Sequence, residues 1–482
     1  MNNLNFVFSL LFTILIFSNA NAKKYYNEKE IKSETNWKKV SVRENAANHL
    51  SLISQGKFND TLVNKYDKNY YYPASAGEDI DIFVFDGGFE FNNEDFTEND
   101  NRIAKCVISI DNGVVTEIKN EKVCHGHVES FHGKLTAITA AGNVYGVASK
   151  ANVYGIVIKY DEYDDEEYQY FYNDVVAGLK YVRKHLFRPH KAVFNFSFGN
   201  TYNSTEYEEK REILEELQTL ITEMSNEGAV FVAASGNESA DTGMFKKKGL
   251  HNVPASLDNV ISVGGIQNNI ETDMIVIPND GYYDDTMKTE RYVVDKRSNY
   301  GKEVDIYAPF WMHYSGDIYF EEIVYKYVSH LLGDIDLSQI VKVTPIENGY
   351  LTEDIEFIIS GTSFSSPIVA GVAATIMSEN PQIKFTTKTM LEYLTKLGEK
   401  DIIAGIPKDA PNVFVNNGKH TVYSSDDKYQ GCGPLAGNQK CGNGQCCTID
   451  GQCSSDESLC QIDYFNKNDK KSVKCIVKVK KY

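Results

Sequence analysis

The most informative stretch of the chain is Ser360-Gly361-Thr362-Ser363-Phe364-Ser365-Ser366-Pro367, a run of small and hydroxyl-bearing residues that precedes an apolar helical pattern. Taken alone, a serine at the start of an apolar helix is more often a helix cap than a reactive group. Two upstream segments change that interpretation. Asp86 follows the apolar strand pattern of residues 81–85, and His132 precedes a run of small residues typical of a tightly packed helix. An acid, a base and a nucleophile in this order are the groups that acyl transfer from a peptide requires.

Apolar runs alternate with helical patterns from about residue 80 onward, which predicts an α/β fold with a doubly wound parallel sheet covered on both faces. Helices are predicted at Asn173–Leu186 and at Ile213–Met224, where Gly228 follows the second. The predicted strands are Asp81–Phe85, Asn152–Ile158, Ala192–Phe198, Ala229–Ala233 and Val260–Val263.

The composition is acidic, with 67 Asp and Glu against 49 Lys and Arg and a net charge of −18. Nucleic acids and anionic membranes would repel such a chain, so neither is expected as a partner. Cationic or neutral partners fit this charge better, and the acid, base and nucleophile described above point to protein or peptide substrates.

The N-terminus carries a short apolar run, Phe6–Phe17, that ends in Ala20-Asn21-Ala22. The run is too short to span a bilayer, and its small-residue end is typical of a cleavage site, so residues 1–22 are predicted to be a signal peptide. The expected location is secreted and extracellular, with no membrane contact after cleavage. Because no Lys or Arg precedes the run, an uncleaved anchor remains the alternative.

Seven of the nine cysteines lie within Cys432–Cys475, a density typical of a disulfide-stabilised module in an oxidising compartment. Cys106 and Cys124 are left to bridge a loop ahead of His132, and Cys475 is the odd thiol.

Two further histidines, His125 and His127, compete with His132 for the role of base. With Cys124 they also suggest a metal site, but no further ligand cluster accompanies them. No metal or cofactor is therefore predicted, and the sequence does not assign a structural calcium ion.

From about Asn36 to Leu397 the chain resembles subtilisin-family serine proteases, most closely the proteinase K branch. The resemblance rests on blocks in family order. They are Asp86-Gly87-Gly88, His132-Gly133 with Tyr145-Gly146-Val147-Ala148, Ser197-Phe198-Gly199, Ala233-Ala234-Ser235-Gly236-Asn237, Pro254-Ala255-Ser256, Asp305-Ile306-Tyr307-Ala308-Pro309 and the Ser363 segment.

The resemblance implies a serine endopeptidase with Asp86, His132 and Ser363 as the catalytic triad. The spacing of its histidine block selects His132 over the other two histidines. It implies Asn237 as a donor of the oxyanion hole, beside the backbone N–H of Ser363. It also implies that Ser197, Phe198 and Gly199 form an extended edge that pairs with the substrate main chain.

One block departs from the family pattern. The family's His-Gly-Thr-His-Val-Ala-Gly is His132-Gly133-Lys134-Leu135-Thr136-Ala137-Ile138 here, so the second histidine and the last glycine are lost. Ile138 in place of glycine threatens a helix contact and thereby the position of His132. The rival interpretation is a catalytically weakened protease scaffold that acts as a carbohydrate-binding or adhesion protein.

The spacing of Cys432, Cys441, Cys446, Cys447, Cys453 and Cys460 resembles the hevein-like, type 1 chitin-binding module. The resemblance implies three disulfides, Cys432–Cys447, Cys441–Cys453 and Cys446–Cys460. In that family a serine and three aromatic side chains contact the sugar, and the matching positions are Thr448, Asp450, Gln452 and Leu459. Because no aromatic ring remains at these positions, chitin binding is expected to be weak, and a structural module or a module with another ligand is at least an equal alternative.

The expected organisation is a signal peptide (1–22), a short N-terminal segment (23–35), a catalytic domain (36–422), a linker (423–430), the cysteine module (431–461) and a basic tail (462–482). Residues 310–359 are expected to be a surface insertion with a helix near 321–332. An acidic run at 161–167 would lie beside the substrate cleft according to the resemblance, and it would favour substrates with basic residues.

Overall fold

The computed structural model describes residues 26–55, 67–97, 102–119, 121–126, 131–158, 172–268, 276–277, 292–316, 355–423, 445–448 and 453–459. The predicted signal peptide, acidic run, helix near 321–332, basic tail and most of the cysteine module lie outside these residues. None of the helices in the described part of the chain is long and apolar enough to cross a membrane.

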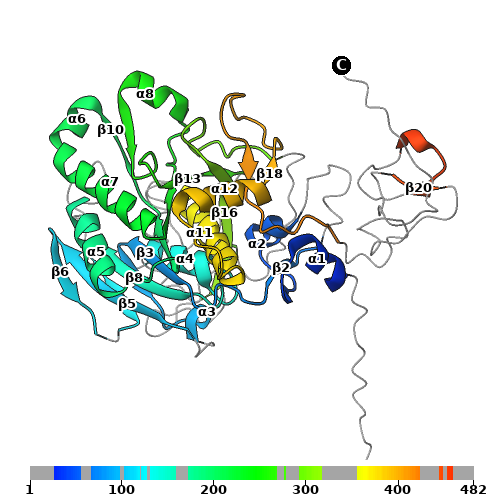
Figure 1. Cartoon of the computed structure of the whole chain (residues 1–482), viewed down its shortest axis with the longest axis horizontal. Coiled ribbons are helices and arrows are strands. Elements are labelled where there is room, and N and C mark those ends of the chain that lie inside the picture. The colour runs from blue at the N-terminus through cyan, green and yellow to red at the C-terminus, as the bar shows by residue number, and fades with distance from the viewer. Residues whose placement is uncertain are drawn as a thin grey trace, which may run out of the picture.

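A ten-stranded sheet forms the centre of the body (Figure 1). Its strands run parallel from β19 to β5, and β18 and β6 add antiparallel edges. In spatial order the strands are β18 (Glu399–Lys400), β19 (Val413–Phe414), β15 (Ile306–Pro309), β13 (Ile261–Ile266), β11 (Ala229–Ala234), β9 (Ala192–Phe196), β3 (Asp81–Asp86), β8 (Asn152–Ile158), β5 (Ala104–Asp111) and β6 (Val114–Glu117).

Strand β3 shows why this sheet is covered on both faces. Its residues are all buried, and alternate side chains point to opposite faces because the side-chain period of a strand is two. Ile82 and Val84 belong to the apolar cluster that includes helices α4 (Phe131–Ala141) and α11 (Thr362–Glu379). Phe83 and Phe85 belong to the cluster of α5 (Tyr172–His185) and α7 (Arg211–Asn226). The predicted doubly wound α/β fold is confirmed.

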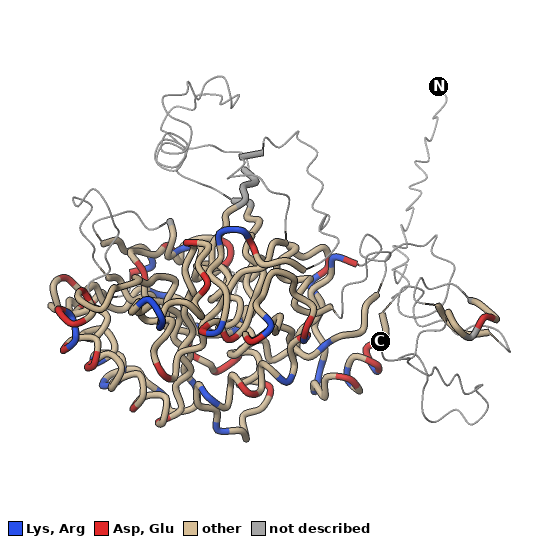
Figure 2. The backbone as a smooth tube through the Cα atoms, turned by 90° about the horizontal axis from the view of Figure 1, so that it is seen from above, with Lys and Arg blue, Asp and Glu red and all other residues tan. Residues whose placement is uncertain are grey.

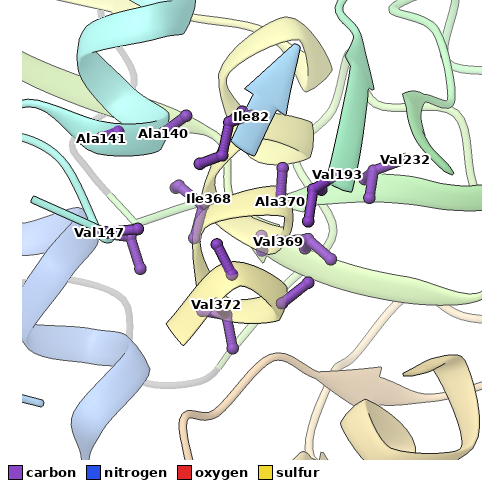
Figure 3. Packing of buried hydrophobic residues seen from close by; sticks show 14 of the residues in the cluster. Ile82, Ala140, Ala141, Val147, Val193, Val232, Ile368, Val369, Ala370 and Val372 are labelled. Atoms are coloured by element: carbon purple, nitrogen blue, oxygen red, sulfur yellow. The ribbon is translucent and has the colours of Figure 1, made fainter. Parts of the chain in front are cut away.

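Helix α11 lies at the centre of the first cluster, where its residues Ile368, Val369, Ala370 and Val372 meet side chains of the sheet and of α4 (Figure 3). The helix can approach this closely because Gly371 has no Cβ. A Cβ there would lie 2.6 Å from both the carbonyl oxygen of Ala140 and the Cβ of Val147. The small residue at this position therefore allows α11 to lie close against α4.

The other described helices are shorter or peripheral. They are α1 (Glu28–Thr35), α2 (Asn48–Ser51), α3 (Glu94–Thr97), α6 (Ser204–Glu209), α8 (Phe245–Lys248) and α12 (Thr387–Leu397), with 3-10 turns η1 (Leu52–Ser54), η3 (Thr242–Met244) and η7 (Glu457–Leu459). Figure 2 shows acidic and basic residues interspersed along the surface of the body rather than separated into two halves.

Small sheets complete the described structure. β1 (Val40–Arg43) pairs with β2 (Tyr70–Pro73), β4 (Gly88–Glu90) with β7 (Val123–His125), β10 (Asn200–Asn203) with β12 (Leu250–Val253), and β20 (Cys446–Cys447) with β21 (Cys453–Ser454). β17 (Ile355–Ser360) pairs with both β14 (Val276–Ile277) and β16 (Trp311–Gly316).

The ends of residues 310–359 differ from the predicted surface insertion. Trp311–Gly316 and Ile355–Ser360 form an antiparallel pair, and Trp311 and Met312 are buried. No local sequence pattern indicates this pairing, because the two strands are separated by a long connection. The pair leads directly into Gly361 and α11.

The two segments that flank the main body of the structure, residues 26–37 and 420–423, pack onto each other. Ile31 of α1, Trp37, Tyr71 and Tyr423 form a small buried cluster, and Glu34 accepts hydrogen bonds from the backbone N–H of His420 and Thr421. Residues 23–35 were expected only as a short segment, so α1 is an addition. Tyr423, the first residue of the expected linker, is buried in this small cluster.

The predicted elements otherwise agree with the structure to within a few residues at each end. The largest differences are β9, which ends at Phe196, and β13, which continues to Ile266. The disulfide expected between Cys106 and Cys124 is present and joins β5 to β7. It stabilises the chain between Asp86 and His132.

Candidate active site

Asp86 and His132 are brought together by the end of β3 and the start of α4. The Asp86 carboxylate is nearly buried; its Oδ1 accepts the backbone N–H of Gly87 at 2.8 Å, and its Oδ2 lies 2.8 Å from Nδ1 of His132. Thr136 adds a longer contact to Oδ2 at 3.4 Å. Because the carboxylate holds Nδ1 as a donor, Nε2 of neutral His132 is the acceptor.

Gly133 explains how the helix comes so close to the strand. A Cβ at this position would lie 2.1 Å from the carbonyl oxygen of Gly88 and 2.9 Å from the Cβ of Asp86. Any larger residue would therefore push α4 away from β3 and β4. Lys134 adds an ion pair with Glu90 of β4 at 2.7 Å.

The pKa of His132 is the balance of opposing effects. Burial lowers it, and the charge of Asp86 and the hydrogen bond to that carboxylate raise it by more, so the pKa lies above its usual 6.5. Asp86 thus both orients the ring and stabilises its protonated form.

The changed residues behind His132 are accommodated without loss of this pair. Leu135 and Ile138 are fully buried in the cluster that contains α4 and α11. The close approach of α11 to α4 is made at Gly371, against the carbonyl oxygen of Ala140. The 2.8 Å contact between His132 and Asp86 is present with Ile138 in place.

Ser363 lies in the first turn of α11 and is held by Ser197, directly after β9. The Ser363 hydroxyl donates to the Ser197 carbonyl at 3.0 Å, and the Ser197 hydroxyl donates to the Ser363 carbonyl at 2.7 Å. Nδ2 of Asn195 donates a hydrogen bond to the Ser197 hydroxyl oxygen at 2.8 Å. The hydroxyl oxygens of Ser197 and Ser366 lie 3.2 Å apart. Within the described part of the chain, the Ser363 hydroxyl makes no hydrogen bond to His132.

Asn237 follows β11 and is held by the residue before Ser363. Its Oδ1 accepts hydrogen bonds from the backbone N–H of Thr362 at 2.9 Å and from the Thr362 hydroxyl at 3.1 Å. These bonds fix the amide, and Nδ2 has no partner among the described residues. A donor without a partner beside the Ser363 turn is the group that an oxyanion hole requires.

Phe198 and Gly199 continue from Ser197 toward β10. Phe198 is buried against Phe196, and a Cβ on Gly199 would lie 2.8 Å from the carbonyl oxygen of Val253. The edge predicted to pair with substrate is thus fixed on one side by β12, which Val253 ends.

The competing histidines have other places. His125 is exposed in β7, opposite Gly88, and His127 lies outside the described residues. The sulfur of Cys124 is taken by its disulfide, so it is not available as a metal ligand. Among the described side chains, no group of three or more His, Cys, Asp or Glu residues is arranged to hold a metal ion.

Several residues of the site were not identified from the sequence. Thr136, Thr362, Ser366 and Asn195 contact the predicted groups directly. Asn195 had a usable signal, because an amide inside the apolar strand Ala192–Phe196 must find a hydrogen-bond partner when buried.

The cysteine module is described only in part. Cys446 and Cys447 are both disulfide-bonded, and each expected bridge includes a cysteine outside the described residues. Thr448 is buried and Leu459 is 55% exposed, whereas Asp450 and Gln452 lie outside the described residues.

Residues 77–401 match the model of the subtilase family, peptidase family S8. Subtilase-type proteinase RRT12 of Saccharomyces cerevisiae is 25% identical over 78% of this chain and 59% of its own length, and psp3 of Schizosaccharomyces pombe is 24% identical over 72% and 58%. Proteinase T of Parengyodontium album is 24% identical over 73% of this chain and 87% of its own. The crystal structure of a cold-adapted subtilisin-like serine proteinase aligns with a TM-score of 0.48 and 20% identity, covering 77% of this chain and 98% of that one. The chain spans less than two thirds of the first two relatives, but the family model covers most of it. This chain belongs to the subtilase family of serine proteases.

Proposed function

We propose that the protein is a serine endopeptidase that hydrolyses peptide bonds through Asp86, His132 and Ser363. The observation that carries this proposal is the 2.8 Å contact between the buried Asp86 carboxylate and Nδ1 of His132, at the sheet edge where α11 presents Ser363. The ring centroid of His132 lies 5.7 Å from that of Phe364, the residue after Ser363. A polarised imidazole near a serine at a helix start is the arrangement that activates a hydroxyl for acyl transfer.

In the proposed reaction, the Ser363 hydroxyl turns from the Ser197 carbonyl toward Nε2 of His132. His132 takes the hydroxyl proton while Oγ attacks the carbonyl carbon of the substrate. Asn237 Nδ2 and the backbone N–H of Ser363 stabilise the oxyanion. His132 then donates the proton to the leaving amine, and an acyl-enzyme on Ser363 remains. Water, deprotonated by the same imidazole, releases the acid and restores Ser363.

The substrate main chain is proposed to pair with Ser197, Phe198 and Gly199. Such pairing adds a strand to an exposed edge and reads the peptide backbone more than its side chains. The burial of Phe198 and the contact of Gly199 with Val253 support a rigid edge.

The experiment that tests this function is hydrolysis of casein by purified protein, with and without Ser363→Ala. We expect cleavage by the natural sequence and none above background by the variant, with unchanged circular dichroism. Equal cleavage by both proteins would refute the proposal. The absence of cleavage by a folded natural sequence would favour the rival non-catalytic adhesion protein.

We further propose that residues 1–22 direct secretion and that 431–461 form a disulfide-stabilised, hevein-like module with weak chitin affinity. The disulfide-bonded state of Cys446 and Cys447 and the exposed aliphatic side chain of Leu459, at a position expected to be aromatic, support this proposal. An aliphatic side chain offers no ring face for a sugar.

Mass spectrometry of secreted protein should find residues 1–22 removed and no free thiol among the six module cysteines. Chitin beads should retain it weakly, and Leu459→Trp should increase retention. Strong retention of the natural sequence would contradict the low-affinity proposal.

A further inference from the structure

We propose that Arg297 determines specificity on the leaving-group side of the cleft by binding a substrate carboxylate within the first three residues after the cleaved bond. This inference rests on the proposed peptidase function. The motifs that carry the triad do not include Arg297, and no sequence pattern assigns a role to it.

The guanidinium of Arg297 is held in place but has spare donors. Its Nη2 donates to the hydroxyl of Ser360 at 2.6 Å, and its carbon Cζ lies 5.1 Å from the ring centroid of Phe310 and 5.0 Å from that of Trp311. Nη1 has no hydrogen-bond partner among the described residues, and the side chain is 37% exposed. Two aromatic rings and one hydrogen bond therefore fix a cation that still presents N–H groups.

The neighbouring acid neutralises this cation only in part. Oδ1 of Asp295 accepts the backbone N–H of Arg297 at 3.0 Å but lies 3.8 Å from its Nε, while Oδ2 accepts the indole N–H of Trp311 at 2.8 Å. Nε itself is buried without a hydrogen-bond partner. Asp295 therefore orients the local backbone and Trp311 more than it occupies the guanidinium.

The order of strands in the sheet places Arg297 on the leaving-group side of Ser363. β9 leads to Ser197, β11 leads to Asn237, and β15 leads to Phe310, on which Arg297 stacks. If the acyl part of the substrate pairs at Ser197, the leaving part extends across Asn237 toward β15. The backbone of Arg297 lies on this path, because its carbonyl accepts the N–H of Ser239, two residues after Asn237.

The short separation of Ser360 and Ser363 in the sequence limits which substrate residue Arg297 can reach. Ser360 is three residues before Ser363, so their Cα atoms are at most about 10 Å apart. An extended peptide advances about 3.3 Å per residue. The cation is thus within reach of a side chain on the first three residues after the cleaved bond.

The chemistry of the site favours a carboxylate. A planar guanidinium with unused N–H groups binds a carboxylate through two parallel hydrogen bonds, and a stacked guanidinium loses little side-chain freedom on binding. The carboxylate could come from a Glu or Asp side chain or from the free C-terminus of a short peptide. Both sources present the same group.

The test is a set of quenched fluorogenic peptides that are identical up to the cleaved bond. Gln, Glu or Lys is placed in turn at the first, second and third residue after it, and short versions end in a free or an amidated C-terminus. At low salt we expect kcat/KM for Glu to exceed that for Gln about 2- to 5-fold at one of these positions, and Lys to be disfavoured. The preference should nearly vanish at about 1 M salt, because the cation is partly exposed.

Three variants separate recognition from structural damage. Arg297→Gln should bring the Glu/Gln ratio to about one, and Arg297→Lys should retain part of it. Arg183→Gln, which removes one positive charge at the ion pairs with Glu223 and Glu227, should leave the ratio unchanged. The ratio compares two substrates of the same enzyme, so a general loss of activity does not change it.

A Glu/Gln ratio near one at all three positions and for both termini would overturn the proposal, as would an unchanged ratio in Arg297→Gln. Free-terminus peptides alone showing the effect would assign the carboxylate to the chain end. Failure to cleave any peptide would refute the peptidase function instead, so the two failures are distinguishable.

Discussion

The two flanks of Ser363 are built from different kinds of groups. On the side of β9, Asn195, Ser197 and Ser366 are neutral, almost fully buried and joined to one another by hydrogen bonds. On the side of β15, Asn237 is exposed and the cation of Arg297 is partly exposed.

We infer from this difference that the β9 flank positions the reacting groups and that the β15 flank selects among substrates. Buried neutral groups hold the nucleophile and the main-chain edge without the cost of burying charge. Exposed groups with spare donors can respond to the charge of the substrate and of the reaction. We therefore expect substitutions on the β9 flank to change turnover for all substrates alike, and those at Arg297 to change the choice among substrates.

The largest loss of activity is expected at Ser363 and His132 themselves. Ser363→Ala and His132→Ala should each reduce kcat about 10⁶-fold, because neither nucleophile nor base can act alone. Peptide hydrolysis measured against a sensitive background control checks this. Turnover near that of the natural sequence in His132→Ala would direct attention to His125 and His127.

Asp86→Asn should reduce kcat about 10⁴-fold and change the pH profile. His132 must be neutral to act as base, and its pKa is raised above 6.5 by Asp86 against the effect of burial. In the natural sequence kcat/KM should therefore fall as the pH drops through that raised pKa. Without the carboxylate charge, the acid limb of the residual activity should move to lower pH. A limb at the same pH in both proteins would show that Asp86 does not set it.

Asn237→Ala should cost about 10²- to 10³-fold in kcat with a small change in KM, because the Ser363 N–H remains as an oxyanion donor. Asn237→Asp is the matched control for shape, since it retains both oxygen contacts to Thr362 but removes the donor. An effect confined to KM would contradict the oxyanion role.

Ser197→Ala should have the smallest effect, about 5- to 10-fold on kcat, because it removes one hydrogen bond to the Ser363 carbonyl and leaves Asn195 without its partner. The loss should be the same for Glu and Gln peptides. A changed Glu/Gln ratio in Ser197→Ala would contradict the proposal that the β9 flank affects all substrates alike.

The sequence predicted the sheet because strands and helices depend on local patterns of apolar residues, and parallel strands end at one edge. Asp86, His132 and Ser363 could be named as candidates because each ends or begins an apolar segment, but the choice of His132 over His125 and His127 depended on the family resemblance. Arg297 could not be found in this way. Its role depends on Phe310, Trp311 and Ser360, which meet only through the pairing of β16 with β17 across a long connection. The effect of Ile138 also needed the structure, which shows Ile138 fully buried while the contact between His132 and Asp86 is present.

The most direct test of the central claim is to locate the reactive serine. A fluorophosphonate reagent should label the natural sequence at one site, and peptide mass spectrometry should place the label on Ser363. The rate of labelling should rise with pH through the raised pKa of His132 and should be abolished in His132→Ala. A label on another residue, or equal labelling of the natural sequence and His132→Ala, would contradict the account.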